Sequence, residues 1–433
     1  MKIAILGGGL TGLTAAYHLS KKGHTVVVYE GAERLGGLAQ GFHREGWEWE
    51  LERTYHHIFN NDHEILNLAH EIGYFGFKFK TPLTASLFGE VNNYRIFPVD
   101  SPKDFLLLPE LSLIAKLRAG VTLVFLKLSP FLPFYEKITS SSFLRMTMGN
   151  EVWKVLWEQL FRKKFGIFAE KILASFIWAR VTKRTQSLGY PDGGFQTFID
   201  ALAVKDKELG VAINKSSIIT EIHKTGNGYE VVGKKEGSDF CEAVDTIIST
   251  LPYPTTLKVM SDLLGEEYCA KQRKRKYLFA INLILKTDKP LLNTAYWLNV
   301  GAKDIPFMCV VQHTNFVDKK HYENKHIAYI AWYVEGSSDL MKKNEEEMLA
   351  FVLPYLKNMQ PNLTADPEVV ALIKAPYAQP IFDAEFTTIP RTFTTREKRI
   401  LIANLDMTYP YDRGTNYAVQ LGKEVSNYFL NQP

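Results

Sequence analysis

Residues 1–30 of the chain, MKIAILGGGLTGLTAAYHLSKKGHTVVVYE, carry the pattern that decides the fold. The apolar run 2–6 predicts a buried strand, because it is short and a glycine-rich turn follows it at once. A helix is expected over about residues 10–22 and a second strand over 25–29. This order of strand, turn, helix and strand is typical of a unit that binds a dinucleotide.

The glycines of this stretch have the spacing that a pyrophosphate requires. Gly7, Gly9 and Gly12 stand in G-x-G-x-x-G register, which allows a tight turn, close approach of the backbone and close helix packing. The N-terminus of the following helix favours negative charge. Glu30 lies about 20 residues beyond the turn, where a carboxylate binds ribose hydroxyls and repels a 2′-phosphate. NADP is therefore disfavoured, while NAD and FAD both stay open.

Length and composition narrow the class of protein. The chain has 433 residues, of which 46% are hydrophobic, so it can form two domains. A net charge of +4 is too small to indicate nucleic-acid binding, and the basic run 271–276 is expected to be a solvated helix end. The three cysteines are scattered, so no metal site or disulfide is expected and a cytoplasmic location fits. With a strand beginning at residue 2, no cleaved leader is expected.

Residues 104–135 form the most apolar region of the chain. Charged residues and three prolines interrupt it, so it is too broken to cross a bilayer. We expect a helical layer that covers an apolar substrate pocket. Plain core is one alternative, and peripheral contact with the inner face of a membrane is the other.

The remaining chain divides into helical and strand-rich parts without a long linker. Helical patterning dominates residues 62–74 and 103–180, and a strand pair separated by TGNG is expected over 216–235. Aromatic-rich strands then predict an antiparallel or mixed sheet with one face toward a cavity. These strands are expected at 277–286, 295–300, 307–316 and 326–334.

Three separated segments resemble the superfamily of FAD-dependent amine oxidases, protoporphyrinogen oxidases and phytoene desaturases. The first is GGGLTGLTAAYHL, with Glu30 and the continuation ERLGG. The second is LGYPDGGFQTFIDALA, with its double glycine at 193–194, and the third is IANLDMTYPYDRGTNYAVQLG, residues 402–422. The resemblance extends over nearly the whole chain and favours FAD as the cofactor.

The resemblance implies an α/β fold. A Rossmann-like FAD-binding domain, residues 1–80, 186–275 and 390–433, would be interleaved with a substrate-binding domain, residues 81–185 and 276–389. The substrate-binding domain would consist of a mixed β-sheet covered by helices.

The resemblance also implies the cofactor contacts. The helix that begins near Gly414 would place its N-terminus at the pyrimidine edge of the flavin. The superfamily usually has Gly-Asp where this chain has Ala403 and Asn404, so the ribityl or phosphate contact would come from the Asn404 amide or from Asp406. The full expected set is Gly7, Gly9, Leu10, Thr11, Gly12, Glu30, Gly31, Arg34, Gly36, Gly37, Leu38, Ile219, Asn404, Asp406, Gly414, Thr415, Asn416 and Tyr417.

Candidate catalytic residues follow the second glycine turn. The resemblance implies that this segment runs along the flavin, so Tyr55, His56 and His57 are candidates there, because histidine can transfer protons near neutral pH or orient the substrate. The alternative is that adjacent histidines point opposite ways, one packed and one exposed. His313 can be either a site residue or a core histidine. Asp412 and Arg413 can contact the substrate or pair with each other to hold the loop. The aromatic residues of the expected sheet can line the cavity or belong to the sheet core; they are Trp297, Trp332 and Tyr333.

The expected function is hydride transfer between flavin N5 and an apolar or amphipathic small molecule, such as an isoprenoid, a tetrapyrrole precursor or an amine. An alternative is a sugar isomerisation without net redox change, as in UDP-galactopyranose mutases. That alternative requires arginines that bind a diphosphate. Arg118, Arg145, Arg162 and Arg180 are candidates. A non-enzymatic escort of prenylated proteins is the least favoured alternative.

Overall fold

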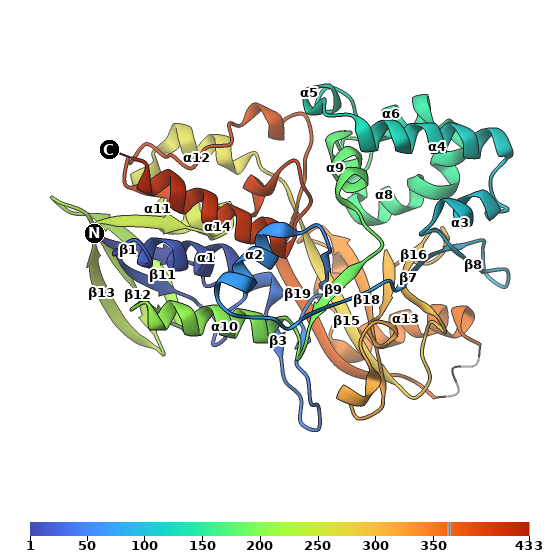
Figure 1. Cartoon of the computed structure of the whole chain (residues 1–433), viewed down its shortest axis with the longest axis horizontal. Helices are drawn as coiled ribbons and strands as arrows, with labels where there is room; N and C mark the ends of the chain where they lie inside the picture. The colour runs from blue at the N-terminus through green and yellow to red at the C-terminus, as the bar shows by residue number, and fades with distance from the viewer. Residues whose placement is uncertain (362, 364, 433) are drawn as a thin grey trace.

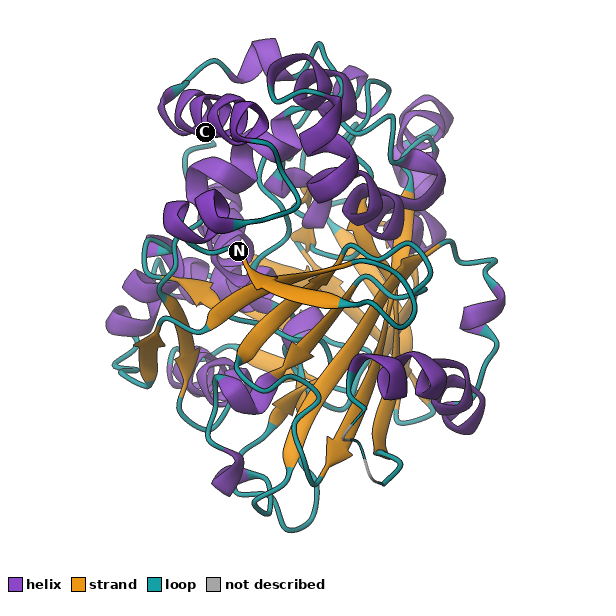
Figure 2. Ribbon diagram, turned by 90° about the vertical axis from the view of Figure 1, so that its right-hand side faces the viewer, coloured by secondary structure: helices purple, strands orange, loops and turns teal. Residues whose placement is uncertain are grey.

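The computed structural model describes residues 1–361, 363 and 365–432. Two large β-sheets lie in different halves of the molecule, and a group of helices, α3 to α9, packs beside the second sheet (Figure 1). The turned view shows most helices gathered above the strands (Figure 2). The fold is therefore mixed α/β, as the sequence predicts.

The first sheet has five strands in the order β10-β2-β1-β14-β20, and all neighbours are parallel. Helices α1 and α14 cover one face, and α11 with the β-sheet β11-β12-β13 covers the other. Short apolar strands that are buried on both faces are typical of parallel sheets. The strands are β1 (Lys2–Leu6), β2 (Thr25–Tyr29), β10 (Ala212–Asn214), β14 (Thr246–Ser249) and β20 (Ile400–Ile402).

Further elements surround this sheet. The pair expected around TGNG forms β11 and β12, which are antiparallel, and β13 continues that sheet. Two small sheets, β3-β4 and β5-β9-β6, link the halves. The bounds are α1 (Leu10–Ser20), α2 (His63–Glu71), α10 (Phe195–Glu208), α11 (Tyr253–Leu264), α12 (Glu266–Arg273), α14 (Thr415–Leu430), β3 (Gly41–Phe42), β4 (Leu51–Glu52), β5 (Ile58–Phe59), β6 (Phe77–Lys80), β9 (Leu188–Pro191), β11 (Ser217–Lys224), β12 (Tyr229–Lys235) and β13 (Ser238–Val244).

The second sheet has seven strands in the order β19-β15-β18-β17-β16-β7-β8. Only β16 and β7 are parallel among these pairs of described strands, so the sheet is mixed, as expected. Helix α13 (Glu345–Met359) packs on one face, and the other face borders the helical group. The strands are β7 (Leu83–Phe88), β8 (Arg95–Pro98), β15 (Tyr277–Thr287), β16 (Ala295–Val300), β17 (Cys309–Gln312), β18 (His326–Val334) and β19 (Glu368–Pro380).

The helical group packs beside the seven-stranded sheet and leaves much of its outer apolar surface exposed. Helix α4 buries its small side chains Ala115, Ala119 and Thr122, together with Leu126, while its larger apolar side chains face outward. No helix within the described residues is long and apolar enough to cross a bilayer. The group comprises α3 (Pro102–Leu107), α4 (Leu113–Leu128), α5 (Leu132–Tyr135), α6 (Ser140–Thr147), α7 (Asn150–Val152), a π-helical turn (Trp153–Trp157), α8 (Glu158–Phe165) and α9 (Ser175–Lys183).

Helices α1 and α14 pack closely because one position on α14 has no side chain. A Cβ atom on Gly422 would lie 2.5 Å from the carbonyl oxygen of Thr11 and 2.7 Å from Cβ of Thr14, both on α1. Backbone atoms cannot yield at that distance without moving the helices apart. The contact fixes α14 against the helix that begins at the glycine turn.

We predict that Gly422→Ala lowers the free energy of unfolding by about 1–3 kcal/mol, because the added methyl group overpacks the α1–α14 interface. Gly120→Ala is the matched control, since Gly120 also lies inside a helix and its Cβ would meet no described atom within 4 Å. Alanine at that control site should raise stability by up to about 1 kcal/mol through helix propensity. Thermal unfolding measures both. Equal melting temperatures for Gly422→Ala and the parent would contradict the close packing.

Candidate functional site

The glycine turn joins β1 to α1 and forms an open backbone cradle. Gly7 has φ +111°, and a Cβ on Gly12 would lie 2.0 Å from the Gly7 carbonyl oxygen, so neither position accepts a side chain. Gly9 runs beside Gly36, and a Cβ on Gly9 would come no closer than 3.8 Å to a described atom, Cα of Gly37. The cradle is thus lined by backbone alone.

Glu30 lies beside this cradle at the end of β2. Its two carboxylate oxygens accept hydrogen bonds from the backbone N–H groups of Gly8 (2.7 Å) and Ala32 (2.8 Å). The backbone oxygen of Glu30 accepts from the N–H of Ser217, where β11 begins. This contact brings β11, with the half-buried Ile219, into the same region. Gly31, which follows Glu30 in sequence, is exposed.

The second glycine turn packs against the first. The N–H of Gly36 donates to the carbonyl of Gly8 over 2.9 Å. Arg34, expected near the pyrophosphate, pairs with Glu50 at 2.6 Å. The carbonyl of Leu38 accepts a hydrogen bond from the Thr54 hydroxyl at 2.7 Å, which connects this turn to the segment with the candidate catalytic residues.

Helix α14 presents a second open N-terminus. Among the described residues, no side chain caps Gly414 at α14 or Gly9 at α1, so the first N–H groups of both helices are left for another acceptor. Thr415 is buried, and the side-chain oxygen of Asn416 accepts from the N–H of Ile65 at 3.1 Å. Tyr417 stacks on Tyr411 with ring centroids 4.6 Å apart.

Two residues that were expected to contact the cofactor, Asn404 and Asp406, instead bond to other residues inside the protein. The side-chain amide of Asn404 donates to the carbonyl of Leu251 at 3.3 Å. Asp406 accepts from the hydroxyl of Tyr277 at 2.7 Å and lies 3.5 Å from the buried guanidinium of Arg275. Asp406 is therefore engaged in a buried ion pair, whereas the glycine turns, Glu30 and the two helix N-termini share one side of the five-stranded sheet.

Tyr55, His56 and His57 lie deep in the protein, yet their side chains are only half-buried. We infer that the three side chains border an internal space, because part of their surface stays accessible although Phe59, Tyr296 and Trp297 pack around them. Nδ1 of His56 lies 2.6 Å from the carbonyl oxygen of Thr54, and Nδ1 of His57 lies 3.2 Å from the hydroxyl of Tyr296. The two histidines therefore bond to different partners, as alternating side chains on an extended segment do.

Burial controls the protonation of these groups. It lowers the pKa of His56 to about 4 and that of His57 to about 3, and it raises the pKa of Tyr55 well above its usual value. Both histidines are therefore neutral at physiological pH. They can accept or donate a hydrogen bond, but they do not carry a positive charge there.

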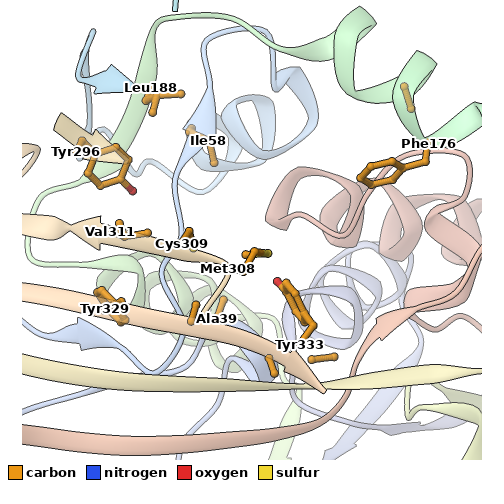
Figure 3. Close-up of a cluster of buried hydrophobic side chains, with 14 of the residues drawn as sticks. Ala39, Ile58, Phe176, Leu188, Tyr296, Met308, Cys309, Val311, Tyr329 and Tyr333 are labelled. Atoms are coloured by element: carbon orange, nitrogen blue, oxygen red, sulfur yellow. The ribbon is translucent and has the colours of Figure 1, made fainter. Parts of the chain in front are cut away.

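Aromatic side chains from the seven-stranded sheet and α9 surround this space. Figure 3 shows Tyr296 and Tyr333 with their hydroxyl groups turned toward the middle of the cluster, and Phe176 of α9 on its far side. Tyr55 packs edge-on against Trp297 at 5.0 Å. Trp332, in contrast, packs with Phe307 in the core on the other face of the sheet.

A buried carboxylate that the sequence interpretation missed holds the segment before Tyr55. Glu52 accepts from the hydroxyl of Tyr190 at 2.8 Å and from the N–H of Phe195, the first residue of α10, at 2.7 Å. Burial raises its pKa to about 7. Gly194 makes this approach feasible, because a Cβ there would lie 2.6 Å from the carbonyl of Glu50.

A group of charges on the helical side was also incompletely predicted. Lys164 and Arg180 lie 2.7 Å and 3.5 Å from one carboxylate oxygen of Asp412. The Arg413 side chain does not pair with Asp412 but donates to the carbonyl of Ala378 at 3.1 Å. Nothing in the spacing marks Lys164, which follows Arg162 and Lys163 as in a solvated helix end.

His313 is a core residue in this arrangement. It is buried, and its Nε2 lies 2.9 Å from the hydroxyl of Tyr322. Within the described part of the chain, no three His, Cys, Asp or Glu side chains are placed to hold a metal ion.

Solved structures share this fold across the whole chain. A putative protoporphyrinogen oxidase from Exiguobacterium superposes with a TM-score of 0.74 at 17% identity, covering 100% of this chain and 99% of that one. A reduced UDP-galactopyranose mutase gives 0.70 at 17% identity, covering 99% and 95%. At these identities the likeness concerns the fold alone.

Sequence similarity identifies the family. A 4,4′-diapophytoene desaturase from Staphylococcus haemolyticus is 41% identical over 54 residues, which span 12% of this chain and only 11% of that protein. The family model of flavin containing amine oxidoreductases matches residues 10–404. The chain therefore belongs to the family of flavin-containing amine oxidoreductases, whose cofactor is FAD.

Proposed function

We propose that the protein is an FAD-dependent oxidoreductase that transfers hydride between flavin N5 and an apolar or amphipathic substrate. The observation that carries this proposal is the set of aromatic side chains of the seven-stranded sheet, Tyr296, Trp297 and Tyr329, that pack around Tyr55 and His57. The match to a desaturase and the fold shared with a protoporphyrinogen oxidase support an isoprenoid or a tetrapyrrole precursor, and the family supports an amine.

The residues present fit FAD. The cradle at Gly9 and Gly37 has no side chain where a pyrophosphate needs backbone contact, and α1 offers unbonded N–H groups there. Glu30 would accept from the ribose, with Leu10, Thr11, Gly31 and Ile219 around it. The open end of α14 at Gly414 would face the pyrimidine edge, where reduction deposits negative charge.

These contacts place the cofactor in the part of the chain built around the five-stranded sheet. We assign residues 1–80, 186–275 and 390–433 to a Rossmann-like FAD-binding domain, and 81–185 and 276–389 to the interleaved substrate-binding domain. All strands of the parallel sheet come from the first set of ranges and all strands of the mixed sheet from the second. The substrate would then lie where the two domains meet.

The protein's own groups would position the substrate and exclude water. When bound, FAD supplies the hydride chemistry. Tyr55, His56 and His57 border the space, and the neutral His57 can accept or donate one hydrogen bond to a bound molecule. The aromatic walls of Tyr296 and Trp297 would keep the reacting centre dry.

A sugar isomerase is the second candidate, supported by the fold shared with a UDP-galactopyranose mutase. Of the four candidate arginines, Arg118 donates to backbone carbonyls at 2.9 and 3.2 Å, while Arg145 and Arg162 pair with Glu170 and Glu158. Arg180 alone of these four lies beside the internal charge group. An escort role without flavin is less favoured, because both glycine turns are intact.

Helix α4 supports a peripheral membrane contact. Seven large apolar side chains project from it with exposed fractions of 51–76%, and at about 100° per residue they lie within an arc of roughly 120°. The opposite face buries mainly small residues, so this helix is more apolar outside than inside. The seven residues are Leu113, Ile114, Leu117, Val121, Val124, Phe125 and Leu128.

The charges of α4 favour an anionic bilayer surface as the occupant. Lys116, Arg118 and Lys127 flank the apolar arc, and the helix contains no acidic residue. Exposed Phe131 and Phe134 extend the apolar surface beyond the helix end. Basic residues beside an exposed apolar stripe are typical of helices that lie in a membrane interface.

The flavin reaction tests the proposed function. Purified protein is expected to show an absorbance spectrum with two flavin peaks between roughly 300 and 550 nm. Without oxygen, a short isoprenoid, a tetrapyrrole precursor or an amine should bleach it. A flavin that stays oxidised with all three, together with UDP-galactose turnover only after dithionite reduction, would favour the isomerase. A protein that cannot be reconstituted with FAD would refute both enzymes.

Gly9→Ala should weaken FAD binding at least about tenfold while leaving the apoprotein's melting temperature unchanged. The backbone at Gly9 has φ −76°, and the added methyl group comes no closer than 3.8 Å to a described atom, an ordinary van der Waals distance, so only the cofactor would clash with it. Gly226→Ala, in the open turn before β12, serves as the control. Fluorescence titration of apoprotein with FAD measures the affinity, and parental affinity in Gly9→Ala would contradict the cradle assignment.

Membrane contact is tested by sedimentation with vesicles. We expect binding to phosphatidylglycerol vesicles, weaker binding to phosphatidylcholine, and a loss of about tenfold or more in the double variant Val121→Gln, Leu128→Gln. Phe75→Gln with Val204→Gln is the control, because these side chains are 70% and 53% exposed elsewhere. Undiminished binding in the α4 variant, or a dimer in solution that it dissociates, would contradict the proposal.

A further inference from the structure

Two cations, Lys164 and Arg180, share the carboxylate of Asp412 at the helical side of the internal space, and a third, Arg413, follows Asp412 in sequence. Lys164 of α8 and Arg180 of α9 lie 2.7 Å and 3.5 Å from the same oxygen of Asp412. Arg413 contacts Asp412 only through its backbone N–H, at 3.1 Å. Its guanidinium lies 4.8 Å from the ring centroid of Tyr333. The single carboxylate of Asp412 cannot neutralise all three cations, so the group keeps a net positive charge.

Nearby groups do not remove this excess. Arg184 has its own partner, Asp100, at 3.2 Å. Lys183 lies over the ring of Tyr411 at 5.1 Å, and its positive charge partly offsets the rise in pKa that burial causes in Asp62. The excess therefore stays at Lys164, Arg180 and Arg413.

Lys164 and Arg413 are buried enough for this excess positive charge to be costly, whereas the Arg180 side chain is 38% exposed. Burial lowers the pKa of Lys164 to about 8 and also lowers the pKa of the Arg413 guanidinium. Positive charge that is poorly solvated and incompletely paired is unfavourable unless an anion joins it. Beyond the contacts already given, the guanidinium donors of Arg180 and Arg413 make no hydrogen bond to a described residue.

The cation group borders the same space as the candidate catalytic residues. Arg180 and Arg413 both affect the titration of Tyr55 and of Cys309, whose pKa burial raises to about 12. Lys164 Nζ is 4.8 Å from the Phe176 ring centroid, and the Arg413 guanidinium is 4.8 Å from that of Tyr333. Figure 3 shows these two rings on the side of the cluster away from Tyr296. One end of the space is thus aromatic and the other is cationic.

We propose that Lys164, Arg180 and Arg413 bind a carboxylate or phosphate group at the polar end of an amphipathic substrate. Arginine side chains bind both oxyanions with parallel N–H···O bonds, and a lysine adds a point charge. The inference rests on the proposed function, because it places that substrate in the same space. It favours an anionic amphiphile and disfavours an amine, whose ammonium group the three cations would repel.

Binding of four matched eight-carbon compounds tests the site. FAD-loaded protein is titrated with octanoate, octyl phosphate, octanol and octylamine, and binding is measured by calorimetry and by perturbation of the flavin absorbance. We expect at least one anion to bind about tenfold more tightly than octanol, and octylamine to bind more weakly than octanol. The stronger of the two anions identifies the oxyanion.

Substitutions then locate the preference. Arg180→Gln should reduce anion affinity about tenfold and leave octanol unchanged. Lys164→Met lowers the net positive charge of the group and should also weaken anion binding. Arg162→Gln, on the exposed side of α8, is the control. An anion preference that survives both site variants would overturn the assignment.

Two outcomes separate this inference from the proposed function. A protein that holds FAD but binds octanol as tightly as both anions overturns the anion site alone. A protein that cannot be loaded with FAD fails the proposed function. UDP that binds more tightly than octyl phosphate and is lost in Arg180→Gln would overturn the amphiphile and assign the cations to a nucleotide diphosphate.

Discussion

One buried residue, Glu52, has hydrogen-bond partners in both halves of the molecule. Glu52 receives hydrogen bonds from Tyr190 of β9 and from the N-terminus of α10, while its backbone carbonyl accepts from the hydroxyl of Tyr329 on β18 at 2.7 Å. Whether it is ionised or neutral, the Glu52 carboxyl group needs hydrogen-bond partners, because an unpaired buried polar group is strongly unfavourable. The bonds fix the start of the segment that carries Tyr55 and His57 into the internal space. The double glycine before α10 is therefore required for packing around Glu52.

The internal space separates two kinds of chemistry. On the side of the seven-stranded sheet, neutral histidines and tyrosine hydroxyls offer hydrogen bonds without charge. On the side of α8 and α9, cations exceed carboxylates. A histidine is a weak source of protons at a pH above its lowered pKa. The side of the seven-stranded sheet is therefore suited to orienting the substrate and excluding water. Selection among substrates would then depend on the second side.

Much of the fold was predictable because local patterns determine it. The G-x-G-x-x-G spacing, the strand pair around TGNG and the final helix at Thr415 each follow from neighbouring residues. The pairing of Asp406 with Arg275 and the burial of Glu52 depend on residues far apart in sequence, so no local signal marks them. The outward direction of the large side chains of α4 was not predicted, for a different reason. A stripe pattern gives two faces but does not say which one the protein covers.

Helix α9 connects the outer apolar surface to the inner cations. Its residue Arg180 belongs to the cation group, and at its C-terminal end the carbonyl of Thr182 accepts from Lys127 of α4 at 2.7 Å. An amphiphile that partitions into a membrane interface keeps its charged group near the polar layer and its chain in the apolar layer. A protein that takes such a molecule from a membrane must offer it both a polar environment for its charged group and an apolar environment for its chain. The outward stripe of α4, the cations of α8 and α9 and the aromatic walls beyond them provide these environments in that order, within one helical group and the sheet it covers.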